Sequence, residues 1–235
     1  MSNISEIKII IKTKADPQRA VASKRYFKCG KGEYGEGDQF TGLTLIDVRE
    51  IAKQYKNISL KEIEIILKSK IHEERTIALA ILVEQFKKAK EKQRTAIYKL
   101  YLKNTRFINN WDLVDISAPK IIGPYLENKN RNILYKLAKS KLLWERRIAI
   151  MSTFHFIKLK QYSDTLKLAE ILLKDKHDLI HKATGWMLRE IGKQNRGVEE
   201  KFLQKYYQQM PRTMLRYAIE KFPETLRQQY ILGQI

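Results

Sequence analysis

The stretch ERTIALAIL at residues 74–82 is the first of five apolar segments that each carry one polar residue about a turn inside. The other four are LVDISAPKII (113–122), ERRIAIMSTF (145–154), IHKATGWML (180–188) and MLRYAIEKF (214–222). The repeated positions are Arg75, Asp115, Arg147, Lys182 and Arg216, at intervals of 115 − 75 = 40, 147 − 115 = 32, 182 − 147 = 35 and 216 − 182 = 34 residues. Such intervals are typical of helical hairpins that stack as HEAT-like repeats. Stacking of the hairpins places the five side chains in one row.

The rest of the chain has the same character, because apolar-periodic segments alternate with short polar breaks. We predict helices near residues 44–56, 59–69, 73–88, 91–103, 111–123, 131–139, 143–158, 162–174, 178–194, 198–208 and 212–221. Ser59 followed by Glu62 resembles a capping box that starts the second of these helices. The predicted fold is all-α, a curved α-solenoid of HEAT-like helical repeats with a basic concave face. A compact irregular helical bundle is the alternative.

We expect residues 1–235 to form a single domain, in which residues 43–235 are regular helical repeats and residues 1–42 hold a first helix (about 17–28) and a Gly-rich loop. The loop runs from Cys29 to Asp38 and contains four of the ten glycines. No strand precedes it, GxxxxGK[ST] is absent, and its three acidic residues disfavour a triphosphate. We interpret it as an ordered packing connection, with an approach of Tyr34 and Phe40 to DNA as the alternative.

Charge is the strongest compositional feature, since 46 Lys and Arg stand against 26 Asp and Glu, a net charge of +20. Such an excess favours a polyanionic partner, and nucleic acid is preferred over a basic surface kept for solubility. One cysteine, Cys29, excludes an internal disulfide and suits a reducing compartment. No segment approaches the ~18 consecutive apolar residues of a membrane span. We expect a cytoplasmic, nucleoid-associated monomer that binds no membrane.

Metal ligands are not indicated by the sequence. CxxC and HExxH arrangements are absent, and the four histidines form no convincing ligand set. His177 and His181 share a helix face but lack a third ligand nearby. We therefore expect no metal site.

The stretch WDLVD at residues 111–115 carries the chemical hypothesis. Trp111 and Asp115 are four residues apart and share one helix face, whereas Asp112 sits where an acid suits the helix dipole. Asp112 is therefore interpreted as structural, and Asp115 either pairs with Arg147 of the next repeat or acts chemically, or does both. A carboxylate held ionised beside aromatic faces suits a cation or a developing oxocarbenium ion.

The tryptophans have two possible interpretations. Trp186 lies four residues after Lys182, so Trp111 and Trp186 both lie on the charged stripe, although either is also an ordinary core residue by default. On the stripe, an indole face attracts a cation by ~0.5–2 kcal/mol. Trp144 lies three residues before Arg147, and an apolar packing role is preferred for it.

Three motifs resemble those of AlkD-type DNA glycosylases, a family built of HEAT-like repeats. They are Asn110-Trp111-Asp112-Leu113-Val114-Asp115, Trp144-Glu145-Arg146-Arg147-Ile148-Ala149 and Lys182-Ala183-Thr184-Gly185-Trp186-Met187-Leu188-Arg189-Glu190. The resemblance covers roughly residues 26–222. It departs from the family where Asn110 replaces a frequent tryptophan and where the Gly-rich loop is longer than in the best-known members.

The resemblance implies an enzyme that hydrolyses the N-glycosidic bond of positively charged alkylated purines, 3-methyladenine and 7-methylguanine, in double-stranded DNA. It implies that Asp115 stabilises the sugar cation and that Trp111 and Trp186 form an aromatic cleft. Arg147 would hold a phosphate and orient Asp115. Water is the nucleophile, so no cofactor is required. Arg75, Lys182, Arg216 and Tyr26 are the expected DNA contacts, Tyr26 by analogy to a family tyrosine.

Two other functions remain open. A non-catalytic HEAT-repeat protein that binds branched or distorted DNA would share the basic row without base release. A protein scaffold with an acidic partner would need an apolar patch on the concave face, and the charged row argues against one.

Overall fold

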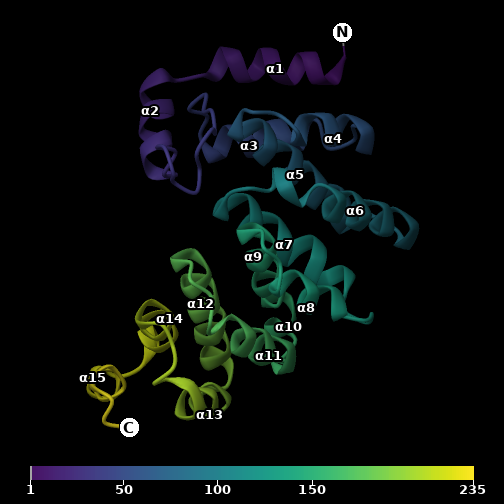
Figure 1. The fold of residues 1–235 in the computed structure, drawn as a ribbon. Helices are drawn as coiled ribbons and strands as arrows, with labels where there is room; N and C mark the ends of the chain where they lie inside the picture. The colour runs from purple at the N-terminus through teal and green to yellow at the C-terminus, as the bar shows by residue number, and fades with distance from the viewer. Residues whose placement is uncertain (1) are drawn as a thin grey trace. The chain divides into compact units, whose positions relative to one another are not determined.

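The computed structural model describes residues 2–235, which form two compact units, residues 2–117 and residues 118–235. In the described residues all regular elements are helices, and Gln39 and Ile71 form an isolated bridge. The prediction of an all-α fold built from helical pairs is confirmed (Figure 1). The predicted curvature, the basic concave face and the single domain stay predictions.

The first unit contains α1 to α6, a short 3-10 turn and the start of α7. Their bounds are α1 Asn3–Lys14, α2 Pro17–Tyr26, α3 Leu45–Gln54, α4 Leu60–Leu67, α5 His72–Lys88, α6 Glu91–Lys103, η1 Thr105–Phe107 and α7 Trp111–Tyr125. Helix α5 is buried on nearly all sides and packs against α3, α4 and α6. It is therefore the central helix of this unit.

Local sequence explains several of these helix starts. Ser59 and Glu62 form the predicted capping box of α4, and Thr44 and Asp47 form a second one at α3. Helix α1 was not predicted. It begins at an N-cap, Ser2, whose hydroxyl accepts the Ser5 N–H, and it buries Ile7 and Ile11 one turn apart.

The second unit continues from α7 with a further set of helical pairs. Their bounds are α8 Asn132–Ala138, α9 Leu143–Ser152, α10 Phe154–Lys158, α11 Ser163–Leu172, α12 Asp178–Gln194, α13 Arg196–Tyr206, α14 Arg212–Ala218, η2 Ile219–Lys221 and α15 Glu224–Leu232. The predicted helix at 143–158 is divided into α9 and α10 at Thr153, and α15 was not predicted.

Helix α12 is central in this unit, since it packs against α9, α11, α13 and α14 (Figure 1). Helices α9, α12 and α14 are the second helices of successive pairs, and they pack directly on one another. This is the neighbour-to-neighbour packing of a helical repeat array. It brings the helices of Arg147, Lys182 and Arg216 side by side, as the residue intervals predict.

Candidate functional site

The N-terminal end of α7 carries Trp111 and Asp115. Asn110 is fully buried, and its Oδ1 accepts the N–H of Trp111 at 2.8 Å, which caps the helix start. Trp111 and Asp115 are both half-buried, one helical turn apart on one face. The interpretation of Trp111 as a core residue is therefore not supported.

Three aromatic side chains gather beside Trp111. The Phe27 ring stacks on the indole with centroids 5.4 Å apart, and the Tyr26 ring meets it edge-on at 5.8 Å. Phe27 in turn stacks on Phe40 at 5.2 Å. Tyr26 stays 66% exposed, so it lies at the surface next to the indole. The structure thus brings together two predicted site residues, Tyr26 and Trp111.

Asp115 also lies near a buried hydroxyl. The Tyr101 hydroxyl and Ser117 Oγ are 2.9 Å apart in the interior of the first unit. Burial is the main reason why the pKa of Tyr101 is raised, and the negative charge of Asp115 adds to it.

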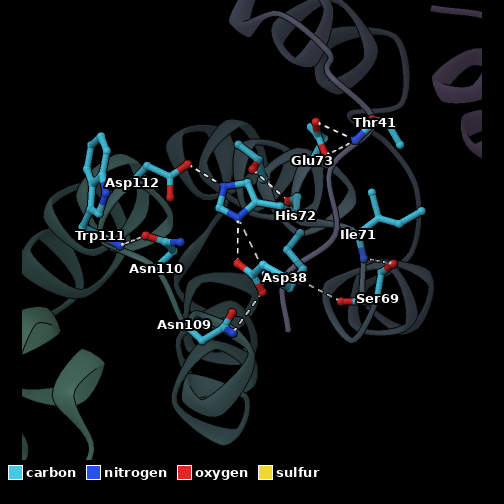
Figure 2. A network of polar contacts seen from close by, with 12 residues as sticks. Asp38, Thr41, Ser69, Ile71, His72, Glu73, Asn109, Asn110, Trp111 and Asp112 are labelled. Atoms are coloured by element: carbon cyan, nitrogen blue, oxygen red, sulfur yellow. Dashed lines mark hydrogen bonds and ion pairs between the residues drawn. The ribbon is translucent and has the colours of Figure 1, made fainter. Parts of the chain in front are cut away.

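Asp112 has a structural partner that the sequence interpretation did not name. Its Oδ2 lies 2.8 Å from Nε2 of His72, a residue in the first turn of α5 (Figure 2). The other ring nitrogen, Nδ1, lies 3.2 Å from Oδ2 of Asp38 in the Gly-rich loop. The predicted structural role of Asp112 is confirmed, and it consists of linking α7 to α5.

The charges of this network explain its protonation. Burial lowers the pKa of His72, but the hydrogen bonds to Asp112 and Asp38 outweigh burial and raise it to about 9. Burial raises the pKa of Asp38, yet His72 and Arg75 hold it below its usual value. At neutral pH the ring is therefore an imidazolium that donates from both nitrogens.

Arg75, an expected DNA contact, is buried against the Gly-rich loop. Its side chain is only 2% exposed. Its NH2 donates to Oδ1 of Asp38 at 2.7 Å and its NH1 donates to the Ser69 carbonyl at 3.0 Å. The Gly-rich loop supplies a buried carboxylate to this arginine, so its guanidinium does not face solvent, and this burial disfavours the expected contact of Arg75 with DNA.

The Gly-rich loop uses its carboxylates to satisfy its own backbone. Glu33 accepts the Gly30 N–H at 2.7 Å, and Glu36 accepts the Gly32 N–H at 2.8 Å. Glu73 of α5 accepts the N–H groups of Thr41 and Gly42 at 2.7–3.1 Å. These N–H groups have partners within the chain, so the loop is an ordered packing connection, as predicted, and not a phosphate cradle.

In the second unit, Arg147 lies on α9 and is 5% exposed. Its NH1 donates to the Leu179 carbonyl in the first turn of α12 at 2.6 Å. This bond fixes the guanidinium between two neighbouring helices. Trp144 is 9% exposed, which confirms its packing role. The predicted pairing of Arg147 with Asp115 stays a prediction.

Trp186 is half-buried on α12, with its indole N–H donating to Oε1 of Glu190 at 3.0 Å. Glu190 also pairs with Lys193 at 2.7 Å, so the acceptor is itself held in place. The Phe154 ring lies 6.3 Å from the indole. As with Trp111, the ring is outside the core and its orientation is fixed by named contacts.

Lys182 and Arg216 occupy more exposed positions on α12 and α14. Lys182 pairs with Asp178 one turn earlier at 2.6 Å and is 38% exposed. Arg216 is exposed on α14. Helices α12 and α14 approach closely because Gly185 has no side chain: a Cβ there would lie 2.3 Å from the Met214 carbonyl oxygen. The glycine before Trp186 is thus a requirement of helix packing.

Metal binding and membrane insertion find no support in residues 2–235. In this range, no group of three or more His, Cys, Asp and Glu side chains is placed to hold a metal ion. Within the same residues, no helix is long and apolar enough to cross a membrane.

The sequence interpretation missed His72 and Asp38. One signal was present, because His72 precedes Asp112 by 112 − 72 = 40 residues, the same interval as Arg75 to Asp115. This shared interval indicated that His72 and Arg75, one turn apart on α5, correspond to Asp112 and Asp115, one turn apart on α7. Asp38 had no such signal, since it comes from an irregular loop.

Comparisons with known proteins concern the family and the fold of the chain. The family model described as DNA alkylation repair enzyme matches residues 10–222. A solved structure described as a predicted DNA alkylation repair enzyme from Enterococcus faecalis is similar, with a TM-score of 0.70 and 16% identity. The match covers 90% of this chain and 98% of that one. A search of curated proteins finds no significant match. The chain belongs to the DNA alkylation repair enzyme family.

Proposed function

We propose that the chain is a DNA glycosylase that removes positively charged alkylated purines, 3-methyladenine and 7-methylguanine, from double-stranded DNA. The observation that carries this proposal is the pair of Trp111 and Asp115, half-buried on one face at the start of α7. Membership of the alkylation repair family supports a role in DNA repair. The AlkD-like motifs around Asp115, Arg147 and Trp186 support the glycosylase in particular.

The chemistry follows from the charge of the lesion. Alkylation at N3 or N7 makes the purine a cationic leaving group, so the bond between C1′ and the base nitrogen breaks without a general acid. Its electron pair leaves with the purine, which becomes neutral, and the sugar becomes an oxocarbenium ion. A water oxygen then bonds to C1′ and releases one proton. Asp115 stabilises the sugar cation and orients this water.

The indoles supply the second part of the mechanism. Trp111 and Trp186 each present a ring face that attracts a cation by ~0.5–2 kcal/mol. Tyr26 extends the Trp111 face toward solvent, where a DNA strand can reach it. An unmodified purine would leave as an anion, which neither the indoles nor Asp115 favours, so normal DNA is spared.

The DNA backbone is held by cations of the second unit in this proposal. Lys182, Arg216 and Arg147 contact phosphates. The net charge of +20 supports a polyanionic partner. We expect a monomer without a cofactor, located in the cytoplasm with the DNA.

Chromatography of the bases released from purine-methylated duplex DNA tests the proposal. The expected products are 3-methyladenine and 7-methylguanine, with no adenine or guanine. Binding of junction DNA with no base released from methylated duplex would favour the non-catalytic DNA-structure binder. Release of unmodified purines at a similar rate would contradict the charge-based mechanism.

A further inference from the structure

His72 joins three segments of the first unit through charged contacts. Its ring is 3% exposed, with Asp38 of the Gly-rich loop on Nδ1 and Asp112 of α7 on Nε2 (Figure 2). Arg75, one turn further along α5, pairs with the same Asp38. The groups that face His72 are thus two carboxylates and one guanidinium. With His72 protonated, two positive and two negative charges balance in this network.

Aromatic contacts follow a parallel route from His72 to Trp111. The Phe40 ring stacks on the imidazole with centroids 4.7 Å apart, and the Phe27 ring lies on it at 4.8 Å. Phe27 also stacks on Trp111. A protonated imidazole is attracted to such rings as a cation. His72 therefore reaches α7 by two independent routes, through Asp112 and through Phe27.

Asp112 connects the contacts of His72 to the helix that carries Trp111 and Asp115. Asp112 directly follows Trp111 and precedes Asp115 by three residues on the same helix. A rotation of α7 about its axis would move the indole and the Asp115 carboxylate together. A hydrogen bond of 2.8 Å from Asp112 to a buried, clamped ring opposes that rotation.

We propose that His72 is a positioning residue for the proposed glycosylase, which sets the orientation of Trp111 and Asp115 by holding the first turn of α7 against α5 and the Gly-rich loop. The effect on base release rests on the proposed function. The effect on the orientation of α7 rests only on the contacts of His72. The proposal assigns the Gly-rich loop a task, since the loop supplies Asp38 and keeps His72 charged.

The first experiment compares single-turnover base release by the wild type and His72→Gln on methylated duplex DNA. Glutamine keeps one hydrogen bond but carries no charge. A misplacement of about 1 Å costs about 10²-fold in rate, so we expect a loss of that order with DNA affinity unchanged. The wild-type rate falls above pH 9, where His72 loses its proton, and the variant lacks this fall.

The matched control is His155→Gln. His155 also pairs with a carboxylate, Glu127 at 2.8 Å, but it lies in the second unit and is 20% exposed. We expect this variant to keep the wild-type rate and the wild-type pH profile. An equal loss in both histidine variants would overturn the proposal.

The second experiment measures hydrogen exchange of the backbone amides of residues 111–118 at pH 7. We expect faster exchange there in His72→Gln than in wild type and His155→Gln. This readout needs no activity, so it decides the positioning role even if the wild type releases no base and the proposed function fails. Unchanged exchange and an unchanged pH profile would overturn the proposal. If His72→Gln does not fold, Asp112→Asn carries the same two measurements.

Discussion

Replacement of Glu199 by glutamine should remove a pH dependence of stability. The Glu199 side chain is 1% exposed on α13, its Oε1 has no hydrogen-bond partner, and its carboxyl lies directly against Gly192 of α12. Burial raises the pKa of this carboxyl to about 8, from an ordinary value of 4.5. The native state therefore binds more protons than the unfolded state between these two pH values, and stability falls as pH rises.

The magnitude follows from the two pKa values. Each pH unit between the two pKa values costs about 1.4 kcal/mol of unfolding free energy. The wild type should thus lose roughly 3–4 kcal/mol of unfolding free energy between pH 5 and pH 8 because of this group. Glu199→Gln cannot ionise, so it should lack this loss.

Urea denaturation at pH 5, 6, 7 and 8 measures the effect as the difference between the two curves. The glutamine amide changes the unfolding free energy by the same amount at every pH. Only the change of the difference with pH is therefore compared. Glu200→Gln is the matched control, because Glu200 is the next residue and pairs with Arg196 at 2.8 Å, with its side chain 33% exposed. Parallel pH curves for wild type and Glu199→Gln would refute the reasoning.

Three further predictions concern packing, the aromatic cleft and the phosphate contacts. Gly185→Ala should lower the unfolding free energy by about 1–3 kcal/mol, because its Cβ would meet the Met214 carbonyl oxygen at 2.3 Å. Gly197→Ala is the control, because the nearest atom to its Cβ would lie 3.7 Å away, and it should leave stability unchanged. Thermal melting compares the two variants. Trp186→Ala should slow base release about 2- to 30-fold, the equivalent of ~0.5–2 kcal/mol, and an unchanged single-turnover rate would count against the cleft. Arg216→Ala should reduce the slope of log affinity against log salt for duplex DNA by ~0.9, whereas Arg75→Gln should leave it unchanged; a reduced slope in a folded Arg75→Gln variant would contradict the burial of Arg75.

Helical periodicity made the all-α fold predictable. Apolar spacing and capping residues are local signals, so the helix containing Ser59 and the close packing of α9, α12 and α14 followed from the sequence. Helix α1 was not predicted, because it buries only two residues, Ile7 and Ile11, and its apolar signal is therefore weak. Helix α15 follows Pro223 and buries only Tyr230, so its apolar signal is weak.

Arg75 and Arg147 show where sequence spacing fails for a site. Both occupy the same position of a repeat, and both are buried, but their partners differ. Arg75 meets Asp38, which lies 37 residues away in an irregular loop, and Arg147 meets a backbone carbonyl of α12. Repeat spacing predicts which helix a side chain belongs to, but a loop without periodicity can supply the group that decides its exposure.

The central claim is that Asp115 stabilises positive charge on the sugar during base loss. The most direct test is the single-turnover rate of 7-methylguanine release by wild type and Asp115→Asn, with equal DNA binding verified. Asp164→Asn is the control, since Asp164 is also a half-buried helical carboxylate, 2.8 Å from Arg131. We predict a loss of ~10²–10³-fold for Asp115→Asn and none for Asp164→Asn. Equal rates for Asp115→Asn and wild type would contradict the account.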